Sequence, residues 1–374
     1  MASMPRKILI IGSFAPSLLN FRGPLISTLR AAGHRVFTAA PNIDGGIASF
    51  LTALGAEPRS LPLANTSLSP VEMVRSFRIL RGLIRETQPD YIIAYTIKPV
   101  ILAALAGRAE RVPRIVALIT GLGYAFTGGR EPKRLISRAM ATLLYRTALR
   151  KVDIVLFQNR DDQAVFRKLG LLPRGKETAI VNGSGIDIEH FVPAPLPPQP
   201  SFLMIARLLG DKGIGEFAAA AARLKAEHPE VKVALVGYLD PSPDSIGQDE
   251  LDRIIASGVE FLGRLEDVRP AIAACSVYVL PSYREGTPRS VLEAMAMGRA
   301  IITTDAPGCR ETVQHEVNGL LVPPRDAEAL YQAMVRLVRE PELIAPMGAQ
   351  SRRIAEERYD VRKVNADLMH YAGL

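Results

Sequence analysis

Two carboxylates, Glu285 and Glu293, stand eight residues apart directly after an apolar run, Val277–Leu280. That run predicts a buried strand, so the first glutamate falls on the following loop and the second on the next helix. The start of a helix offers backbone N–H groups and the positive end of a dipole, and both favour phosphate. A carboxylate repels phosphate, but it accepts hydrogen bonds from hydroxyl groups beside it, such as those of a sugar and a ribose. The stretch therefore predicts a pocket for a nucleotide-sugar.

The helix that carries Glu293 is framed by residues with strong positional preferences. Thr287 is predicted to cap its start, Pro288 to occupy its first position and Gly298 to end it. With these caps, the Glu-x7-Glu pattern and the run 294–298 resemble the donor-binding motif of retaining glycosyltransferases of the GT-B class, family 4. The alternative is an ordinary amphipathic helix with two solvated glutamates, because two glutamates at this spacing are common.

The composition is that of a globular protein. The 374 residues are 48% hydrophobic and 22% charged, which suits two domains with cores of ordinary size. Cys275 and Cys309 fit no metal-binding or redox spacing and are expected to be reduced thiols in a cytosolic protein. The longest apolar stretch, residues 91–106, is interrupted by Lys98 and a proline, so no membrane span is expected. The apolar run 8–12 predicts a first strand rather than a secretory signal.

Charge is distributed unevenly along the chain. Residues 1–195 hold 26 Lys and Arg against 13 Asp and Glu, whereas residues 196–374 hold 20 against 25. A strongly basic half predicts an anionic partner, which is a membrane surface, a nucleic acid or a phosphorylated substrate. Residues 133–151 interleave basic and apolar side chains and predict an amphipathic helix suited to anionic lipid headgroups. The alternative is a helix packed on the sheet with a solvated basic face.

Both halves alternate apolar strands with helical stretches, which predicts an α/β protein with two doubly wound, Rossmann-like parallel sheets and a ligand cleft. The predicted strands are Lys7–Gly12, Arg35–Ala40, Tyr91–Tyr95, Ile115–Ile119, Ile154–Gln158, Phe202–Ala206, Lys232–Gly237, Val259–Leu262, Val277–Leu280, Ala300–Thr303 and Leu320–Val322. Helices of the first half are predicted at Phe21–Ala32, Ser69–Thr87, Val100–Arg108 and Lys133–Lys151. Five prolines within residues 192–200 predict a stiff linker between domains 1–195 and 196–358. In the GT-B class, the last helix, here within 359–374, returns to the first domain.

The resemblance implies where the donor binds. Arg207 and Lys212 match the family's Arg-x4-Lys element, whose cations neutralise a diphosphate as it leaves. Together with Glu285, which accepts hydrogen bonds from the donor sugar, they are the predicted catalytic residues. Glu293 is predicted to bind the ribose. The other implied donor-binding residues follow the first strand, form the base-recognition segment or begin the motif helix; they are Gly12, Arg264, Leu265, Gly286, Thr287 and Ser290.

Three further segments, 19–25, 95–99 and 120–126, resemble a bacterial subgroup that extends lipid-linked oligosaccharides of capsule, O-antigen or protein-glycosylation pathways. Several members of this subgroup are similar to N-acetylgalactosaminyltransferases acting on undecaprenyl-diphosphate sugars. The resemblance implies that Arg22 and Lys98 hold the acceptor diphosphate, whereas the alternative makes both of them surface cations. The predicted acceptor-binding residues are Asn20, Arg22, Lys98, Thr120 and Tyr124.

The resemblance also implies retention of the anomeric configuration, by same-face attack in which the leaving phosphate takes the acceptor proton. No cofactor or metal is expected, because the chain has no Asp-x-Asp motif and Arg207, Lys212 and the helix dipole take the place of a metal. Many relatives carry a first-domain histidine near the reacting sugar, and this chain has none after a central strand. A backbone carbonyl or the Thr120 loop is expected there instead, unless the role is absent.

The resulting prediction is a cytoplasmic glycosyltransferase on the inner face of the plasma membrane. It uses a UDP-sugar, with GalNAc the favoured sugar, and a polyprenyl-diphosphate-linked acceptor. An isomerase of the same fold, such as a UDP-sugar 2-epimerase, is one alternative and would convert its substrate without an acceptor. A non-enzymatic binder of membrane or nucleic acid is another, motivated by the basic half. Nucleic acid is the weaker option because the second half is acidic, so no nucleic-acid partner is expected.

Overall fold

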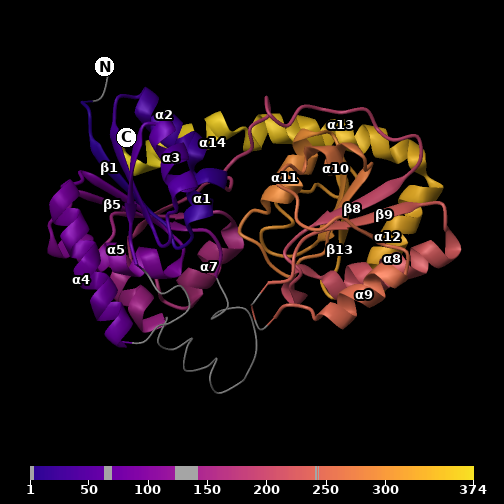
Figure 1. Ribbon diagram of the computed structural model, residues 1–374, viewed down its shortest axis with the longest axis horizontal. Coiled ribbons are helices and arrows are strands. Elements are labelled where there is room, and N and C mark those ends of the chain that lie inside the picture. Colours follow the sequence, from indigo (N-terminus) through magenta and orange to yellow (C-terminus); the bar gives the residue numbers. More distant parts are fainter. Residues whose placement is uncertain (1–3, 63–69, 123–141, 241, 243) are drawn as a thin grey trace. The chain divides into compact units, whose positions relative to one another are not determined.

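The computed structural model describes residues 4–62, 70–122, 142–240, 242 and 244–374 of the chain. The chain forms two compact units, in which unit 1 comprises Met1–Ser184 with Val364–Leu374, and unit 2 comprises Gly185–Lys363. Each unit is a parallel sheet with helices packed against it (Figure 1). The predicted class, α/β with two doubly wound sheets, is confirmed.

The sheet of unit 1 has seven parallel strands in the order β3-β2-β1-β4-β5-β6-β7. In β1, Ile8 and Ile10 belong to one buried cluster, and Leu9 and Ile11 belong to another. Since alternate residues of a strand point to opposite faces, the sheet is covered on both faces, which explains its continuous apolar runs. The strands are β1 (Lys7–Ile11), β2 (Arg35–Ala40), β3 (Ala56–Ser60), β4 (Tyr91–Tyr95), β5 (Arg114–Ile119), β6 (Ile154–Phe157) and β7 (Glu177–Ile180).

The helices of unit 1 follow the prediction in part. The predicted helix Phe21–Ala32 corresponds to α2, whose start two residues later places Pro24 in the first turn, and a separate short helix, α1, with Pro16 in its first turn, precedes it. Of the predicted helix Lys133–Lys151, residues 133–141 lie outside the described ranges, and residues 142–149 are helical. The helices are α1 (Ala15–Asn20), α2 (Gly23–Ala31), α3 (Gly45–Ala53), α4 (Pro70–Thr87), α5 (Ile97–Ala109), residues 142–149, α7 (Arg160–Lys168) and α14 (Val361–Ala372).

Two strands, β3 and β7, and three of the described helices of unit 1, α1, α3 and α7, were not predicted. The strands β3 and β7 lie at the two ends of the strand order, so each has one neighbour and a partly exposed surface. An edge strand needs no continuous apolar run, and it tolerates the proline at position 58. Helix α3 has no charged residue, and α7 is short, with three apolar residues among nine, so neither has the length of apolar pattern that identifies a helix from sequence.

Unit 2 has six parallel strands in the order β10-β9-β8-β11-β12-β13, and all six were predicted. The strands are β8 (Ser201–Ile205), β9 (Lys232–Val236), β10 (Glu260–Phe261), β11 (Val277–Leu280), β12 (Ala300–Thr304) and β13 (Gly319–Val322). The helical segments are η2 (Gly210–Lys212), α8 (Ile214–Glu227), α9 (Gln248–Ala256), α10 (Arg269–Ala273), α11 (Arg289–Ala296), α12 (Ala327–Arg339), η3 (Pro341–Leu343), α13 (Ile344–Ile354) and the π-helical turn η4 (Ala355–Tyr359). Among the described helices of both units, none has the length and apolar character that crossing a membrane requires.

The proline-rich run 192–200 belongs to unit 2 rather than separating the units. The division falls between Ser184 and Gly185, ahead of the predicted boundary at 195. Arg299, which is fully buried, donates a hydrogen bond from Nη2 to the carbonyl oxygen of Ala194 at 2.9 Å. Proline-rich backbone lacks N–H groups but keeps its carbonyl acceptors, so one buried guanidinium can tie this run to the domain.

The chain passes between the units twice, and the two passages are paired. Ile186 donates its N–H to the carbonyl of Tyr359 at 2.7 Å and accepts the N–H of Val361 at 2.9 Å. Gly185 has a φ of +69°, and a Cβ there would lie 2.6 Å from the Cα of Val361. Residues from Val364 onward belong to unit 1, where the side chain of Leu368 is buried in the core. The return of the chain end thus starts slightly later than the predicted residue 359.

Buried His34 makes the stability of unit 1 depend on pH. Its side chain is fully buried, and its Nδ1 accepts the N–H of Arg6 at 3.3 Å. Burial, and then the positive charge of Arg6, lower the pKa of His34 below its ordinary value. Below about pH 6.5, the unfolded chain therefore takes up a proton that the folded chain does not. The free energy of unfolding should fall from about pH 7.5 to about pH 5.5, and the fall should be smaller in H34N. Urea unfolding at both pH values measures this, and equal falls in the two proteins would contradict it.

Candidate active site

In each sheet, the strand order reverses at one central strand: the chain first adds strands on one side of it and later adds strands on the other side. β1 lies between β2 and β4 in unit 1, and β8 lies between β9 and β11 in unit 2. At such a switch point the following loops diverge and leave a crevice at the carboxyl ends of the strands. The predicted residues Arg207 and Lys212 follow β8, Glu285 follows β11, and Gly12 follows β1. The topology therefore places each of them at a switch point of its own unit.

Lys212 and Glu285 meet at the switch point of unit 2. The Nζ atom of Lys212 lies 2.6 Å from Oε1 of Glu285, and each side chain is 16% exposed. Burial by itself would lower the pKa of Lys212, but the carboxylates of Glu285 and Asp211 raise it above its ordinary value. The ammonium group therefore stays charged at neutral pH. The pair is a largely buried cation next to a carboxylate that can accept hydrogen bonds from hydroxyl groups.

The loops that carry this pair are joined to each other. Tyr283 donates its N–H to the carbonyl of Asp211 at 2.9 Å, and its phenol donates to Oε1 of Glu216 at 2.6 Å. Gly213 has a φ of +73°, and a Cβ there would lie 2.3 Å from the carbonyl oxygen of Pro281. Only glycine allows the two loops to approach so closely. In the sequence, the one sign of this contact is a glycine placed before a helix. The sequence analysis assigned no role to Tyr283.

A third loop, after β12, supports Glu285 from another side. Glu285 donates its N–H to the carbonyl of Pro307 at 2.8 Å. Gly308 has a φ of +82°, and a Cβ there would lie 2.2 Å from the carbonyl oxygen of Glu285. Burial, and then the Glu285 carboxylate, raise the pKa of the Cys309 thiol to about 12, so this thiol is neutral and no nucleophile. The sequence analysis did not predict that the loop after β12 supports Glu285. The one signal of this contact in the sequence is a Pro-Gly pair after a predicted strand. Both cysteines, Cys275 and Cys309, are free, as predicted, and both are buried.

Arg207 lies nearer the solvent than Lys212. Its side chain is 50% exposed, and Nη1 lies 3.2 Å from Oδ2 of Asp240. Asp240 follows β9, so Arg207 bridges the carboxyl ends of β8 and β9. An exposed guanidinium with one weak ion pair can turn toward an incoming diphosphate at little cost.

Helix α11 begins later than predicted. Its first residue is Arg289, and Pro288, not Thr287, is the cap residue, without a side-chain capping bond. Pro288 has an extended ψ of 109° and its carbonyl accepts the N–H of Val291 at 3.1 Å, which starts the helix one residue beyond the predicted position. Gly298 has a φ of +76° and ends the helix as predicted.

Glu293 lies on the first turns of α11 with Arg289 beside it. Arg289 donates from Nε to Oε1 of Glu293 at 2.9 Å, and the carboxylate side chain is 13% exposed. Burial raises the pKa of Glu293 above its ordinary value, and the charge of Arg289 acts in the opposite direction. The predicted residues Gly286, Thr287 and Ser290 lie between the two glutamates, on the loop and the first turn. Arg289 was not among the residues singled out in the sequence.

The predicted base-recognition residues follow β10 at the same sheet edge. Gly237, at the end of β9, donates its N–H to the carbonyl of Gly263 at 3.0 Å. The guanidinium carbon of Arg264 lies 5.3 Å from the ring centroid of Tyr238. Leu265 packs against the core of unit 2. These contacts present the backbone after Gly263 at the carboxyl edge of the sheet.

In unit 1, the predicted residues Gly12 and Arg22 meet at Tyr95. A Cβ on Gly12 would lie 2.3 Å from the phenol oxygen of Tyr95, so a larger residue would clash. Ser17 Oγ lies 2.8 Å from the same oxygen. Arg22 is 3% exposed, and its guanidinium carbon lies 4.8 Å from the ring centroid of Tyr95. Arg22 is therefore no surface cation, and it contacts Tyr95, which the sequence analysis placed in the segment 95–99 without giving it a role of its own.

The remaining predicted acceptor residues lie on neighbouring elements of unit 1. Lys98 is on the first turn of α5 and is 6% exposed, and burial lowers its pKa while Glu72 opposes this. Thr120 directly follows β5, and Asn20 is the last residue of α1. Lys98 is thus buried, against the alternative of a surface cation. Tyr124 lies outside the described ranges.

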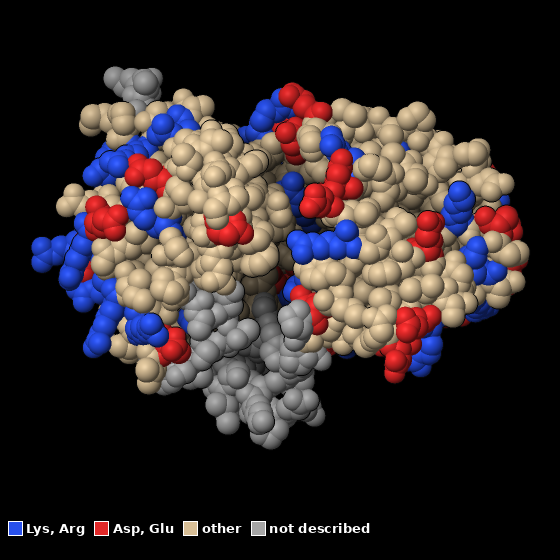
Figure 2. Space-filling view, in the orientation of Figure 1, with Lys and Arg blue, Asp and Glu red and all other residues tan. Residues whose placement is uncertain are grey.

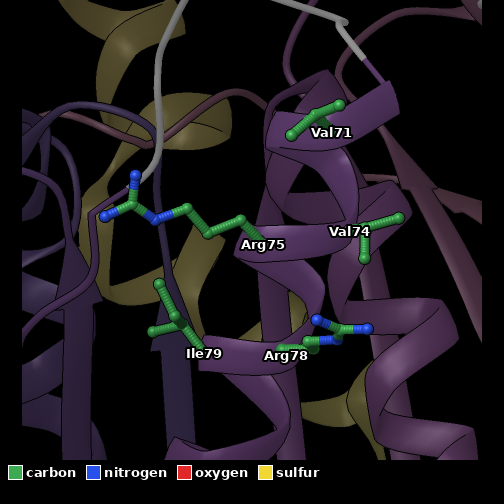
Figure 3. A pocket seen from close by; sticks show the side chains of 5 residues that line it. All are labelled: Val71, Val74, Arg75, Arg78 and Ile79. Atoms are coloured by element: carbon green, nitrogen blue, oxygen red, sulfur yellow. The ribbon is translucent and has the colours of Figure 1, made fainter.

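A groove with a volume of about 530 Å³ lies away from the predicted site residues, along α4 of unit 1 (Figure 3). Figure 3 shows Arg75 and Ile79 on one side of the helix and Val74 and Arg78 on the other. The residues that line it are Val71, Val74, Arg75, Arg78 and Ile79.

Comparison with known protein families identifies the class of enzyme. Residues 199–340 match the family profile described as glycosyl transferases group 1, and residues 23–183 match a glycosyl transferase 4-like domain. The chain is a glycosyltransferase of this GT4-like family. Because each profile falls on one of the two units, the predicted family and the predicted enzyme class are both confirmed.

Two relatives of this glycosyltransferase have informative names. It is 28% identical over 341 residues to an N,N'-diacetylbacillosaminyl-diphospho-undecaprenol alpha-1,3-N-acetylgalactosaminyltransferase of Campylobacter jejuni, covering 87% of this chain and 88% of the relative. It is 25% identical over 297 residues to a UDP-Gal:alpha-D-GlcNAc-diphosphoundecaprenol alpha-1,3-galactosyltransferase of Escherichia coli, covering 76% of this chain and 75% of the relative.

Solved structures agree on the fold of the glycosyltransferase. HepE from Anabaena in complex with UDP has a TM-score of 0.78 and 21% identity, covering 97% of this chain and 98% of that one. A sucrose-phosphate synthase from Thermosynechococcus elongatus has a TM-score of 0.80 and 20% identity, covering 98% of both chains. At these identities the likeness establishes the fold, which is GT-B as predicted.

Proposed function

We propose that this glycosyltransferase moves a sugar from a UDP-sugar to a polyprenyl-diphosphate-linked saccharide, in the assembly of a surface polysaccharide or a glycoprotein glycan. An N-acetylhexosamine such as GalNAc is the proposed sugar. The observation that carries the proposal is the Lys212–Glu285 pair, a buried cation and a hydroxyl acceptor 2.6 Å apart at the switch point of unit 2. The names of the Campylobacter and Escherichia relatives, both of which cite diphospho-undecaprenol sugars, support the choice of acceptor.

The donor binds in unit 2. Lys212 and Arg207 hold the diphosphate, assisted by backbone N–H groups at Gly286, Thr287 and Ser290 before and within α11. Glu285 accepts hydrogen bonds from the donor sugar, and Glu293 accepts them from the ribose. Backbone groups of Arg264 and Leu265 contact the uracil edge. One solved protein with the same fold, HepE, has structures in complex with UDP and with UDP-glucose, which supports a uridine donor.

In the transfer step, the acceptor hydroxyl oxygen bonds to the anomeric carbon as the bond from that carbon to the UDP oxygen breaks. The acceptor proton passes to the leaving phosphate, so UDP departs and no enzymic nucleophile is needed. Attack on the face that the phosphate leaves retains the anomeric configuration. Lys212 stabilises the charge that develops on the departing diphosphate. We propose that the reaction needs no metal, because cations of the chain neutralise the diphosphate.

The acceptor binds in unit 1. Arg22 and Lys98 hold its diphosphate, since both are buried cations close to the carboxyl ends of β1 and β4. Burial strengthens such contacts, because few water molecules compete for the phosphate oxygens. Tyr95 fixes Arg22 by stacking beneath it, and Asn20 and Thr120 contact the saccharide.

A substrate panel tests the proposed function. The protein is incubated with several UDP-sugars, with EDTA, and with or without a polyprenyl-diphosphate-linked saccharide, and UDP release and product mass are followed. We expect UDP release that depends on the acceptor, with one sugar mass added. Conversion of the UDP-sugar without acceptor would instead establish an epimerase. No release with any donor would overturn the proposed donor or acceptor.

We propose that α4 rests on the inner face of the plasma membrane, where a lipid-linked acceptor resides. Val71 and Val74 are 75% and 50% exposed, and Arg75 and Arg78 are exposed on the adjoining turns of the same helix. Exposed valines flanked by arginines match the boundary between acyl chains and anionic headgroups. Figure 2 shows Lys and Arg side chains gathered over the part of unit 1 that carries α4.

Substitutions on α4 should weaken binding to anionic vesicles while leaving transfer to a short, water-soluble acceptor unchanged. R75Q/R78Q removes two charges, which at about 1 kcal/mol each corresponds to about 30-fold weaker binding. V71D/V74D should weaken binding further, because it also removes the apolar contact. Co-sedimentation with phosphatidylglycerol-containing vesicles measures this, and V317D, at a valine that is 41% exposed on unit 2, is the matched control. Wild-type binding by the α4 variants would overturn the proposed surface.

A further inference from the structure

Arg289 and Glu293 form a pair on α11 that the donor chemistry alone does not explain. The donor atom, Arg289 Nε, lies 2.9 Å from Oε1 of Glu293, one helical turn away on the same face. No other described residue donates a hydrogen bond to the Glu293 carboxylate, so Oε2 is left available. One oxygen of the carboxylate is therefore fixed by the protein, and the other can accept a hydroxyl group.

Burial distinguishes this pair from an ordinary surface ion pair. The two side chains are 25% and 13% exposed. Burial raises the pKa of Glu293, and the hydrogen bond and charge of Arg289 hold it down. The titratable and charged groups on the strands and helices packed against α11 are Tyr278, Arg352, Arg353, Glu356, Glu357, Arg358 and Tyr359, and those on the adjoining loops include Lys212, Tyr283, Arg284 and Glu285. Within the described ranges, Arg289 is the cation bonded to Glu293.

We propose that Arg289 is a positioning residue for the donor nucleotide, which keeps Glu293 ionised and fixes its Oε1 so that Oε2 accepts a ribose hydroxyl. The proposal rests on the proposed function, because it uses Glu293 as the ribose acceptor. A guanidinium suits this task because its charge is permanent and its planar N–H groups orient a carboxylate. Arg289 acts through Glu293 rather than on the reacting atoms.

Loss of Arg289 should make UDP binding more sensitive to acid. R289M keeps the length of the side chain but removes its charge, so the pKa of Glu293 rises further and the carboxylate takes up a proton at a higher pH. UDP affinity of R289M should be about tenfold below that of the wild type near pH 6 and close to it near pH 8.5. R289K, which keeps a positive charge, should recover most of the loss.

Isothermal titration with UDP between about pH 5.5 and about pH 8.5 tests the proposal, in the wild type, R289M, R289K, E293Q and R289M/E293Q. The terminal phosphate of UDP itself titrates near pH 6. In E293Q, residue 293 does not titrate, so the pH profile of this variant shows the titration of UDP alone. It is therefore the baseline for the other pH profiles. We expect R289M to have little further effect in the E293Q background, since the proposed action of Arg289 on UDP binding runs through the Glu293 carboxylate.

Two results would overturn the role of Arg289. One is an equal loss of UDP affinity in R289M at every pH, also present in the E293Q background, because Arg289 would then contact the diphosphate itself. The other is a pH profile of R289M identical to that of the wild type. A wild-type protein that binds no UDP at any pH would instead overturn the proposed function, so the two failures are distinguishable.

A second arginine–glutamate pair serves as the matched control. Arg353 and Glu357 have the same spacing on a helix, but they lie 3.9 Å apart and are 59% and 58% exposed. R353M should leave the UDP titration at wild-type values over the whole pH range, because an exposed pair contributes little. Thermal melting of each variant without UDP separates a change in binding from a change in folding.

Discussion

Replacing Glu285 with alanine or glutamine should lower kcat for sugar transfer by about 10³-fold while UDP binds about as tightly as before. The carboxylate accepts the donor sugar in our proposal, so its loss removes a contact to the reacting sugar. The substitution also removes a negative charge that repels the diphosphate. Lys212, which lies 2.6 Å from the Glu285 carboxylate in the wild type, can then pair with the phosphate alone. The fold should persist, because the backbone of this loop is held independently by the carbonyl of Pro307 and by Gly308.

Steady-state transfer kinetics and isothermal titration with UDP on the same preparations check this prediction. E285Q keeps the shape of the side chain and an oxygen for Lys212, so it separates the charge from the packing. E260Q, at an exposed glutamate that begins β10, is the matched control and should behave as the wild type. Near-normal turnover in E285A would contradict the assigned role.

Replacing Lys212 with methionine should weaken UDP binding by about 100-fold and also lower kcat. Methionine retains much of the apolar stem, so the change isolates the ammonium group. Its loss takes away the cation that lies 2.6 Å from the Glu285 carboxylate, which is 16% exposed and then faces an incoming diphosphate of the same sign. Removal of one partner from a buried charge pair is usually costly, and the repulsion of the substrate adds to that cost.

The double variant K212M/E285Q tests the reason for this loss. It should be more stable than K212M, because no buried carboxylate is left uncompensated, and it should bind UDP more tightly than K212M. K232M, at an exposed lysine that begins β9, is the control for an unrelated loss of charge. Unchanged UDP affinity in K212M would rule out Lys212 as a diphosphate ligand.

Predictions from sequence were accurate where a local pattern or a residue type is nearly specific to one kind of structure. The six strands of unit 2 are buried on both faces, so their apolar runs were clear from sequence. The pairing of the loop after β8 with the loop after β11 also follows from a doubly wound order, and Lys212 and Glu285 meet there. The cap at Gly298 was correct because a left-handed residue is nearly specific to glycine.

The errors have a common physical origin in contacts between distant residues. Thr287 was expected as a cap from local preference, but the extended backbone at Pro288 moved the start of α11. The proline-rich run was expected to separate two domains, but the buried guanidinium of Arg299 holds it to one of them. The edge strand β3 was missed, because it depends on its neighbour β2 for pairing rather than on an apolar pattern of its own.

The sequence by itself determined the fold class, the family and the identities of the charged residues after β8 and β11. These follow from the period of apolar side chains and from motifs that are local in the chain. Only the tertiary structure decided that Tyr95 contacts both Gly12 and Arg22, that Gly308 supports Glu285, and that both Arg22 and Lys98 are buried. Burial and close approach depend on segments that are far apart in sequence and meet only when the sheets form. For that reason local pattern identifies which residues can do the chemistry, and packing sets their charge state and their geometry.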